Sequence, residues 1–370
     1  MNVRILGIET SCDETACGIV ELKTSANAQA PLCHLLSNEV YSSMDLHQVY
    51  GGVVPEIAAR SHIESMIPVI EQSLGTAQCS WDDIDGIAVT HGAGLGGSLL
   101  VGVMTARTLA LTKQKPLYAV NHVEAHIYAN FLTKIGDSSQ LTADSYQLAP
   151  EQPTFPMLGL IVSGGHSQLV LWRGHFDYTL LGQTRDDAIG EAFDKVAKII
   201  GLPYPGGPSI SQSAEAGDPK RYQLPQAKLD SEYEFSFSGL KTAVLRLAQQ
   251  EIGESFTFPS HQVAERLSKQ QVADIAASFQ YTAVATVVKA AQAAVKAFQP
   301  RSVVIGGGVA ANRELRRQLQ SALPFPVYYQ DSQLMTDNGA MVATLGCFQA
   351  HLQQPPVNPH TLDIQPNLSM

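Results

Sequence analysis

A strand–polar turn–strand unit occurs twice in this chain, and the repeat narrows the folds open to it. The first copy has apolar strands at residues 3–9 and 16–22, joined by a turn rich in Thr, Ser, Asp and Glu. The second copy has strands at residues 157–162 and 168–172, joined by Ser163-Gly164-Gly165-His166-Ser167. Such internal similarity predicts a duplicated fold with one polar turn in each half.

Length and composition agree with two domains that share a cleft. The chain has 370 residues, 45% of them hydrophobic and 16% charged, which is an ordinary globular composition with a sizeable core.

The five cysteines are scattered without a CxxC spacing, so neither a disulfide framework nor a thiolate zinc site is expected. A formal net charge of -10 argues against nucleic-acid binding by bulk charge alone.

No membrane association is expected from the apolar segments. No apolar run reaches the length of about 18 residues that a membrane-spanning helix needs. The N-terminus begins directly with a strand-like segment and shows no signal-peptide pattern. A cytoplasmic enzyme is the default interpretation.

The polar turn at residues 10–15 can be interpreted in two ways. Its hydroxyls and backbone N–H groups could face a phosphate, and the carboxylates of Asp13 and Glu14 could hold a cation or a water molecule. A plain polar hairpin turn explains the same residues.

Two histidines four residues apart, His122 and His126, are candidate metal ligands. On a helix their imidazoles lie one turn apart on the same face, a spacing that suits one metal ion. The alternative is a surface or core histidine pair with no metal. The stretch is not a zincin motif, because Val123 follows the first histidine and Glu124 is predicted to face away from both.

Glycine-rich loops precede two predicted helices. The loop at 91–98 could hold an anion at the N-terminus of the helix at 99–113, or it could serve close packing against a strand. The loop at 306–313 could approach a nucleotide, with Asn312 bonding a ribose or a base. Asp337 precedes the last helix, and sequence alone favours it as an N-cap over a ligand.

Other polar residues have simpler explanations. His62 is predicted to lie on the surface of a helix at 56–74. Asp186 and Asp187 fit the acidic first turn of another helix, whereas Asp194 lies deeper in it. The alanine-rich region at 263–298 is expected to serve packing.

The pattern also predicts domain limits. An N-terminal lobe covers residues 1–133 and is completed by about 337–352, and a C-terminal lobe covers 157–336. Residues 134–156 form an inserted loop or linker between them. The tail at 353–370 is irregular and either wraps the surface or is mobile.

Nine stretches taken together resemble the TsaD family of tRNA threonylcarbamoyladenosine transferases over about residues 3–350. These stretches are residues 8–15, 92–97, Asn121-His122-Val123-Glu124-Ala125-His126, 162–166, Gly190-Glu191-Ala192-Phe193-Asp194-Lys195, 204–208, 235–242, 307–313 and 336–340. The resemblance implies an α/β fold of the actin/Hsp70/sugar-kinase type, with two duplicated RNase H-like lobes around a central cleft.

The resemblance also implies the site residues. His122, His126 and Asp337 would bind one divalent metal ion, Fe2+ in preference to Zn2+. The substrate site would comprise Ile161, Val162, Ser163, Gly164, Gly165, Asp194, Gly207 and Asn312. Relatives often carry Asp at the position of Ser211, so a ribose contact from that position would be weaker or lost here.

The implied reaction transfers an acyl group to tRNA. The donor is threonylcarbamoyl-AMP, and the acceptor is the exocyclic amine N6 of adenosine 37, next to the anticodon, in tRNAs reading codons that begin with A. The amine attacks the carbamoyl carbon and AMP leaves, with Asp13 or Glu14 accepting the amine proton or holding a water molecule. Binding of ATP with Mg2+ is also compatible with the resemblance.

The implied partners are a TsaB-like paralogous subunit, a TsaE-like ATPase and a synthase that supplies the donor. Such an assembly could build the affinity for tRNA that the acidic chain lacks. Arg313, Arg316 and Arg317 form a basic patch, although a solvated helix face explains them as well.

Three other functions compete with this interpretation. Two phosphate-type turns alone would suit a nucleotide-dependent kinase or ATPase of the same fold, but such kinases hold Mg2+ through phosphates and carboxylates instead of histidines. The metalloprotease interpretation fails because no glutamate directly follows His122 to activate a water molecule. A non-catalytic binding subunit would tolerate loss of the metal ligands, and all three are present.

Overall fold

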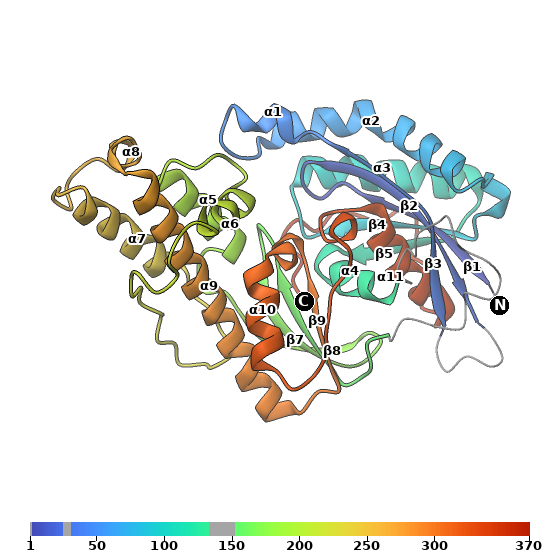
Figure 1. Ribbon diagram of the computed structural model, residues 1–370. Helices are drawn as coiled ribbons and strands as arrows, with labels where there is room; N and C mark the ends of the chain where they lie inside the picture. Colours follow the sequence, from blue (N-terminus) through green and yellow to red (C-terminus); the bar gives the residue numbers. More distant parts are fainter. Residues whose placement is uncertain (1, 25–30, 133–151) are drawn as a thin grey trace, which may run out of the picture. The chain divides into compact units, whose positions relative to one another are not determined.

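The computed structural model describes residues 2–24, 31–132 and 152–370, which divide into two compact units (Figure 1). The first unit comprises residues 1–153 together with 330–370, and the second comprises residues 154–329. Most of the predicted inserted segment, 134–156, lies outside the described residues. No helix within the described ranges has both the length and the apolar character that crossing a membrane requires.

The first unit is built on a five-stranded mixed sheet. Its strand order is β3-β2-β1-β4-β5, with bounds β1 Val3–Glu9, β2 Glu14–Lys23, β3 Leu32–Ser42, β4 Gly86–Gly92 and β5 Leu117–Asn121. The hairpin partners of β2 run antiparallel to it, whereas β1, β4 and β5 run parallel to one another. The central strands are buried on both faces, which is why their sequences are continuous apolar runs.

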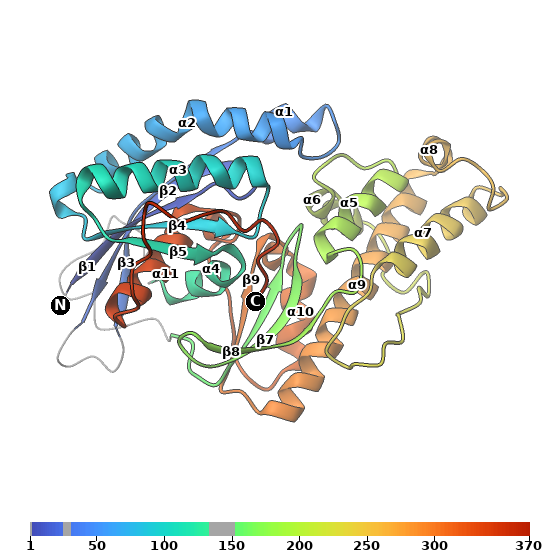
Figure 2. The ribbon, with the colours of Figure 1, turned by 180° about the vertical axis from the view of Figure 1, so that it is seen from behind.

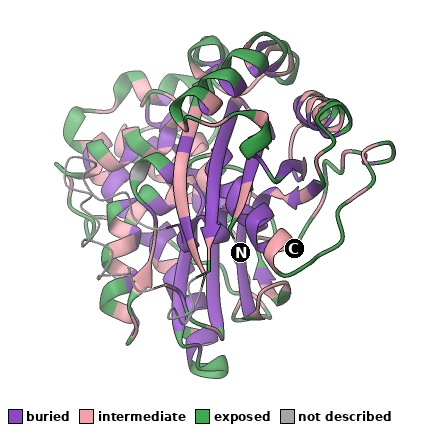
Figure 3. Cartoon of the chain, turned by 90° about the vertical axis from the view of Figure 1, so that its right-hand side faces the viewer, coloured by how far each residue is buried: buried purple, intermediate pink, exposed green. Residues whose placement is uncertain are grey.

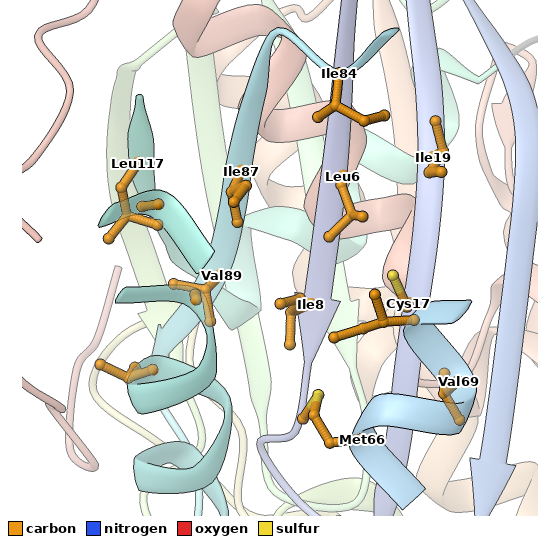
Figure 4. Close-up of a cluster of buried hydrophobic side chains, with 14 of the residues drawn as sticks. Leu6, Ile8, Cys17, Ile19, Met66, Val69, Ile84, Ile87, Val89 and Leu117 are labelled. Atoms are coloured by element: carbon orange, nitrogen blue, oxygen red, sulfur yellow. The ribbon is translucent and has the colours of Figure 1, made fainter. Parts of the chain in front are cut away.

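Helices cover both faces of this sheet (Figures 1 and 2). On one face lie α2 (Pro55–Thr76) and α3 (Gly96–Lys113), with the short α1 (Met44–Gln48) preceding them; on the other lie α4 (His122–Tyr128) and α11 (Gly339–His351). Side chains of α2, α3 and the sheet form one apolar core, which includes Leu6, Ile19, Met66, Val69 and Val103 (Figure 4). Figure 3 shows the strands largely buried and the outward helix faces exposed.

Helix α11 lies unusually close to the sheet because both surfaces carry small residues. Gly7 of β1 pairs with Gly18 of β2, and a Cβ atom on either one would collide with the backbone of α11 near Gly339 and Ala340 or Ala343. This close packing holds the N-terminus of α11 against the strands that flank the first polar turn.

The second unit repeats the same topology. Its strand order is β10-β9-β6-β7-β8, with bounds β6 Met157–Val162, β7 Ser167–Gly174, β8 Asp177–Gln183, β9 Ser302–Gly306 and β10 Val327–Tyr328. As in the first unit, the hairpin strands are antiparallel, and the strands on the other side of the sheet are parallel. The predicted duplication is therefore confirmed.

Six α-helices belong to the described part of this unit. They are α5 Ile189–Ile199, α6 Gly206–Ala214, α7 Ser238–Glu251, α8 Ser260–Val263, α9 Lys269–Phe298 and α10 Arg313–Ala322, with a 3-10 turn at Gly308–Ala311 before α10. Most of the alanine-rich region at 263–298 is helix α9, which begins at a capping box of Ser268 and Gln271, and a 3-10 helix at Ala264–Arg266 precedes it.

Candidate metal centre and ligand pocket

Two imidazoles and one carboxylate meet in the first unit. His122 and His126 lie one turn apart on α4, and Asp337 lies just before α11. The Nε2 atoms of His126 and His122 are 3.2 Å and 3.6 Å from the same oxygen, Oδ1 of Asp337. The ligand atoms of the three residues all lie within 4.8 Å of one another, so one ion could contact all three.

The donor set fits a cation better than it fits an apolar core. The Nε2 atom of His126 is buried, and within the described residues it has no hydrogen-bond partner, since its approach to Asp337 lacks hydrogen-bond geometry. Burial alone would lower the pKa of His122, but the carboxylates of Asp337 and Glu9 raise it to about 9. The surroundings therefore favour positive charge at a position where an uncharged histidine would ordinarily be expected.

Polar side chains behind His122 orient its ring. Its Nδ1 lies 3.1 Å from Oγ of Ser11 and 3.3 Å from Oε2 of Glu9, and the same carboxylate oxygen accepts a 2.6 Å hydrogen bond from Thr90. A carboxylate behind a histidine fixes which ring nitrogen carries the proton and leaves Nε2 for a metal. Sequence analysis missed Glu9, because its place behind His122 depends on the folded sheet.

Helix capping explains how the ligands come together. The Oδ1 atom of Asn121 accepts a 2.9 Å hydrogen bond from N–H of Val123 and starts α4 at His122. At α11 the cap is Asn338, whose Oδ1 accepts a 2.9 Å hydrogen bond from Met341. The prediction of Asp337 as the N-cap was therefore wrong, because the neighbouring residue takes that role and Asp337 lies among the imidazoles.

The glutamate between the histidines is not part of this cluster. Glu124 is buried, its Oε1 atom has no hydrogen-bond partner among the described residues, and burial raises its pKa to about 7. Its carboxylate is absent from the set of clustered ligand atoms, in agreement with the expectation that it points elsewhere.

The first polar turn lies close enough to Asp337 for their charges to interact. Burial first, and then the negative charges of Asp337 and Asp13, together raise the pKa of Glu14 to about 9. The main-chain oxygen of Asp13 accepts hydrogen bonds from N–H and Oγ of Ser43. The turn is therefore fixed by its surroundings and is more than a plain solvent-exposed hairpin.

His62 also fixes this turn, so its predicted place on a helix surface was wrong. The side chain is fully buried, with Nδ1 2.8 Å from Oγ1 of Thr15 and Nε2 3.0 Å from the carbonyl oxygen of Cys12. His62 lies on the buried face of α2, one helical turn from Ala58 and one from Met66, which are buried as well.

The glycine loop before α3 serves close packing. Two of its N–H groups are occupied: Gly94 donates to the carbonyl of Pro366, and Leu95 donates to that of Ser11. A Cβ atom at Gly92 or Gly94 would collide with the backbone of Gln365 or Ser11. The structure shows the close packing that one of the two interpretations predicts, and anion binding at the start of α3 stays a prediction.

The second unit contains a pocket of about 780 Å³. Of the predicted substrate residues, it is lined by Gly164, Asp194, Gly207 and Asn312. The other four contribute to its frame without lining it: Ile161 and Val162 are buried in β6, and Oγ of Ser163 accepts a 3.0 Å hydrogen bond from N–H of His166. Gly165 follows in the same turn.

Asp194 fixes one wall of the pocket. Its Oδ1 accepts a 2.7 Å hydrogen bond from N–H of Gly206, the first residue of α6. Burial raises the pKa of Asp194, although this hydrogen bond opposes the shift. A side chain at Gly206 would collide with the backbone at Phe193 and Asp194, so the turn can lie this close only with glycine there.

Asn312 is hydrogen-bonded to Gln280, a residue that also lines the pocket and that sequence analysis missed. The Nδ2 atom of Asn312 donates to Oε1 of Gln280 at 2.8 Å and to Oγ of Ser211 at 3.1 Å. Gln280 belongs to α9, where the alanine-rich pattern indicated packing alone, and a glutamine facing a pocket carries no local sequence signal.

The metal-ligand candidates and the pocket residues both lie within a segment that matches a known family. The model of the family "TsaD: tRNA N6-adenosine threonylcarbamoyltransferase" matches residues 34–344. The chain belongs to the TsaD family.

Curated TsaD relatives cover nearly the whole chain. A tRNA N6-adenosine threonylcarbamoyltransferase of Thermomicrobium roseum is 48% identical over 346 residues, which are 92% of this chain and 90% of the relative. The protein of the same name from Symbiobacterium thermophilum is 45% identical over 347 residues, 93% of this chain and 91% of the relative.

Similarity to solved structures concerns the TsaD fold only. HypF of T. kodakarensis matches with a TM-score of 0.57 at 14% identity, over 95% of this chain and 48% of that chain. Full-length HypF in its phosphate- and nucleotide-bound form matches with a TM-score of 0.53 at 14% identity, over 95% of this chain and 56% of that chain. With its duplicated mixed sheets, the TsaD chain has the predicted actin/Hsp70/sugar-kinase fold.

The acidic residues before α5 of this TsaD chain have another role than predicted. The helix begins at Ile189, so Asp186 and Asp187 precede it and do not belong to its first turn. Asp186 accepts hydrogen bonds from the hydroxyls of Ser236 and Ser238, each at 2.6 Å, and Asp187 pairs with Lys195 at 2.6 Å. Asp186 therefore anchors the loop that leads into α7.

The basic patch at α10 is largely engaged within the TsaD chain. Arg317 forms an ion pair with Glu314 at 2.6 Å, and the guanidinium of Arg316 lies 4.4 Å from the ring centre of Tyr329. Arg313 and Arg317 also line the pocket. Contacts within the chain therefore account for Arg316 and Arg317 without a nucleic-acid partner.

Proposed function

We propose that this chain transfers the threonylcarbamoyl group from threonylcarbamoyl-AMP to N6 of adenosine 37 in tRNAs reading codons that begin with A. The observation that carries the proposal is the TsaD family match over residues 34–344, within which all three predicted metal ligands come together. The kinase alternative is not favoured by the relatives, and the protease alternative lacks a glutamate in the cluster.

The proposed reaction needs positioning more than covalent catalysis. The amine nitrogen forms a bond to the carbamoyl carbon, the bond from that carbon to the phosphate oxygen breaks, and AMP leaves with the electron pair. The amine loses one proton, for which Asp13 of the first polar turn is the proposed acceptor, directly or through a water molecule. Glu14, whose pKa is raised to about 9, carries a proton at neutral pH, so its proposed role is to hold that water molecule. Orienting the two reactants provides much of the rate enhancement in such a transfer.

We propose that His122, His126 and Asp337 hold one divalent ion, Fe2+ in preference to Zn2+. Two imidazoles and a carboxylate without a thiolate suit either ion. Such an ion supplies Lewis-acid stabilisation of negative charge when it is bound. The chain's own contribution is to orient these ligands, through Glu9 and Ser11 behind His122 and through the Asn121 cap at the start of α4.

The pocket of the second unit is proposed to bind the AMP part of the donor. It is lined by Asp194, Gly207 and Asn312, and its size, about 780 Å³, is in the range of small-molecule sites. The turn from Ser163 to Gly165, with Ile161 and Val162 before it, is the proposed contact for the phosphate or the threonylcarbamoyl group. ATP with Mg2+ is a second proposed occupant of the pocket.

Partner proteins are also part of the proposal. An apolar groove of about 350 Å³ lies between α2 and α3, where Ile63 and Ile67 are 66% and 55% exposed and Leu100 and Met104 are 47% and 46% exposed. Exposed apolar side chains that gather in this way favour a protein partner. We propose a TsaB-like subunit there, with a TsaE-like ATPase, a synthase that supplies the donor, and a cytoplasmic location.

A reconstituted assay tests the function. The purified chain would be combined with unmodified tRNA, the donor synthase and the two partner proteins, and digested tRNA would be analysed for threonylcarbamoyladenosine by mass spectrometry. His126→Ala should remove bound metal and the modification, whereas His261→Ala, an exposed histidine of the second unit, should retain both. A wild-type assembly that forms no modified nucleoside would refute the proposal.

A further inference from the structure

Three polar side chains meet on one wall of the pocket in the second unit. Ser211 comes from α6, Gln280 from α9 and Asn312 from the residue before α10, and all three line the pocket. The Oε1 atom of Gln280 accepts hydrogen bonds from Oγ of Ser211 and from Nδ2 of Asn312, both at 2.8 Å. The three side chains therefore form one connected network.

A helix cap sets the direction of every hydrogen bond in this network. The Oδ1 atom of Asn312 accepts a 3.0 Å hydrogen bond from N–H of Leu315 and caps α10, so the amide nitrogen of Asn312 must point to the other two side chains. Because that nitrogen can only donate, Gln280 must present its oxygen to it. The amide nitrogen of Gln280 then remains, and no protein acceptor for it occurs in the described part of the chain.

The hydroxyl of Ser211 is constrained in the same way. It gives its single proton to Gln280 and accepts from Nδ2 of Asn312 at 3.1 Å, so one lone pair remains to accept another hydrogen bond. This wall thus offers the pocket a donor, Nε2 of Gln280, beside an acceptor, Oγ of Ser211. Neither group carries a formal charge.

A neighbouring donor and acceptor of this kind complement a vicinal diol, in which one hydroxyl accepts and the other donates. We infer that Gln280 is a specificity-determining residue of the pocket, where its amide donates to one ribose hydroxyl of a nucleotide while Ser211 accepts a proton from the other. This inference rests on the proposed function for the presence of a nucleotide. It adds a residue and a hydrogen-bond direction to that function.

The competing explanation is that Gln280 only holds Ser211 and Asn312 in place. Two substitutions separate the roles. Gln280→Glu keeps the shape and the acceptor that both neighbours need, but it replaces the donor facing the pocket with an acceptor. Gln280→Ala removes both functions, and Gln292→Ala, on an exposed face of the same helix, is the matched control.

Isothermal titration calorimetry of the full-length chain with AMP, 2′-deoxy-AMP and 3′-deoxy-AMP tests the inference. Loss of one hydrogen bond should weaken AMP binding by Gln280→Ala roughly three- to tenfold, and Gln280→Glu should weaken it at least as much. One of the two deoxy analogues lacks the hydroxyl that Gln280 contacts. For that analogue, Gln280→Ala and the wild type should have the same affinity. Gln292→Ala should bind all three nucleotides as the wild type does.

Three results would overturn the inference. They are wild-type AMP affinity in Gln280→Glu, an equal loss for AMP and for both deoxy analogues in Gln280→Ala, and absence of saturable AMP binding by the wild type. The readout is independent of tRNA modification. A chain that discriminates these nucleotides as expected but fails to modify tRNA would therefore refute the proposed function and leave the role of Gln280 standing.

Discussion

The Nδ1 atom of His62 lies 2.8 Å from Oγ1 of Thr15, and this contact ties helix α2 to the polar turn that carries Asp13. The opposite ring nitrogen lies 3.0 Å from the carbonyl oxygen of Cys12. A single buried imidazole thus contacts both the side chain and the backbone of the turn. Its neutral form can supply one donor and one acceptor, as the two contacts require.

Replacement of His62 by Ala should destabilise the first unit. Two buried polar groups would lose their partner and a cavity would remain, so we expect a loss of about 2–4 kcal/mol in the free energy of unfolding. Urea denaturation followed by circular dichroism measures this loss. Glu64→Ala, an exposed position on the same helix, should change the stability by less than about 0.5 kcal/mol. Equal stability of the two variants would contradict the role assigned to His62.

The same histidine should make stability depend on pH. Burial is the main cause that lowers the pKa of His62 below its ordinary value, and the hydrogen bond to Cys12 only partly opposes the shift. Above the unfolded-state pKa, near 6.5, both states are neutral and the group makes no difference. As the pH falls below that value, the unfolded chain binds the proton more readily, so stability decreases until the folded pKa is passed.

His62→Gln isolates this contribution, because glutamine keeps one donor and one acceptor without titrating. The wild type should lose stability more steeply than the variant as the pH falls from about 7 to about 5.5, with an upper limit near 1.4 kcal/mol per pH unit. Urea titrations at several pH values measure the difference in slope. Parallel pH profiles for the two proteins would show that the buried histidine does not titrate differently on unfolding.

Metal binding should stabilise the folded chain. When the concentration of an ion that binds only the folded state is 100 times its dissociation constant, the free energy of unfolding rises by about 2.7 kcal/mol. This rise corresponds to several degrees in Tm. Fe2+ under anaerobic conditions, or Zn2+, should therefore raise the Tm of the wild type. The increase should vanish in His126→Ala and in Asp337→Asn, and it should persist in His261→Ala. A metal-induced shift that survives in both ligand variants would place the ion elsewhere.

Local sequence patterns predicted the strands and helices well, because burial and residue spacing determine where these elements form. The strands at 3–9 and 157–162 are continuous apolar runs, and such runs are expected of strands covered on both faces. The grouping of His122 with His126 follows from one helical turn. By contrast, Asp337 and Asn338 are neighbours with similar capping propensities, so only the three-dimensional structure separates the ligand candidate from the cap.

The residues that were missed depend on tertiary contacts. Glu9 ends a strand like many surface residues, and only the folded sheet places its carboxylate behind His122. Gln280 lies in a long packing helix, and its role depends on the cap formed by Asn312. His62 lies on the buried face of helix α2 with Ala58 and Met66, and only the folded chain shows that this face, instead of the one with Ile63 and Ile67, is buried.

One arginine makes three of the hydrogen bonds that hold the C-terminal segment at 353–370 against the rest of the first unit. Arg107 of α3 donates hydrogen bonds to the carbonyl oxygens of Pro359, His360 and Leu362, at 2.5 Å, 2.8 Å and 3.2 Å. Beyond these contacts, Gln365 donates to the carbonyl of His91 at 2.7 Å, in the loop that precedes α3. Arg107 thus fixes the segment that in turn covers the glycine loop.

Arg107→Lys should release this segment despite keeping the positive charge. A lysine presents one compact ammonium group, so it cannot reach three carbonyl oxygens that a guanidinium fork spans. We expect a loss of about 1–3 kcal/mol in the free energy of unfolding and faster proteolysis after residue 352, which mass spectrometry of the fragments would locate. Arg60→Lys, at an exposed position of α2, is the control. If Arg107→Lys resists proteolysis as the wild type does, the remaining contacts of the tail, such as the bond from Val357 to Leu117 at 2.8 Å, must suffice to hold it.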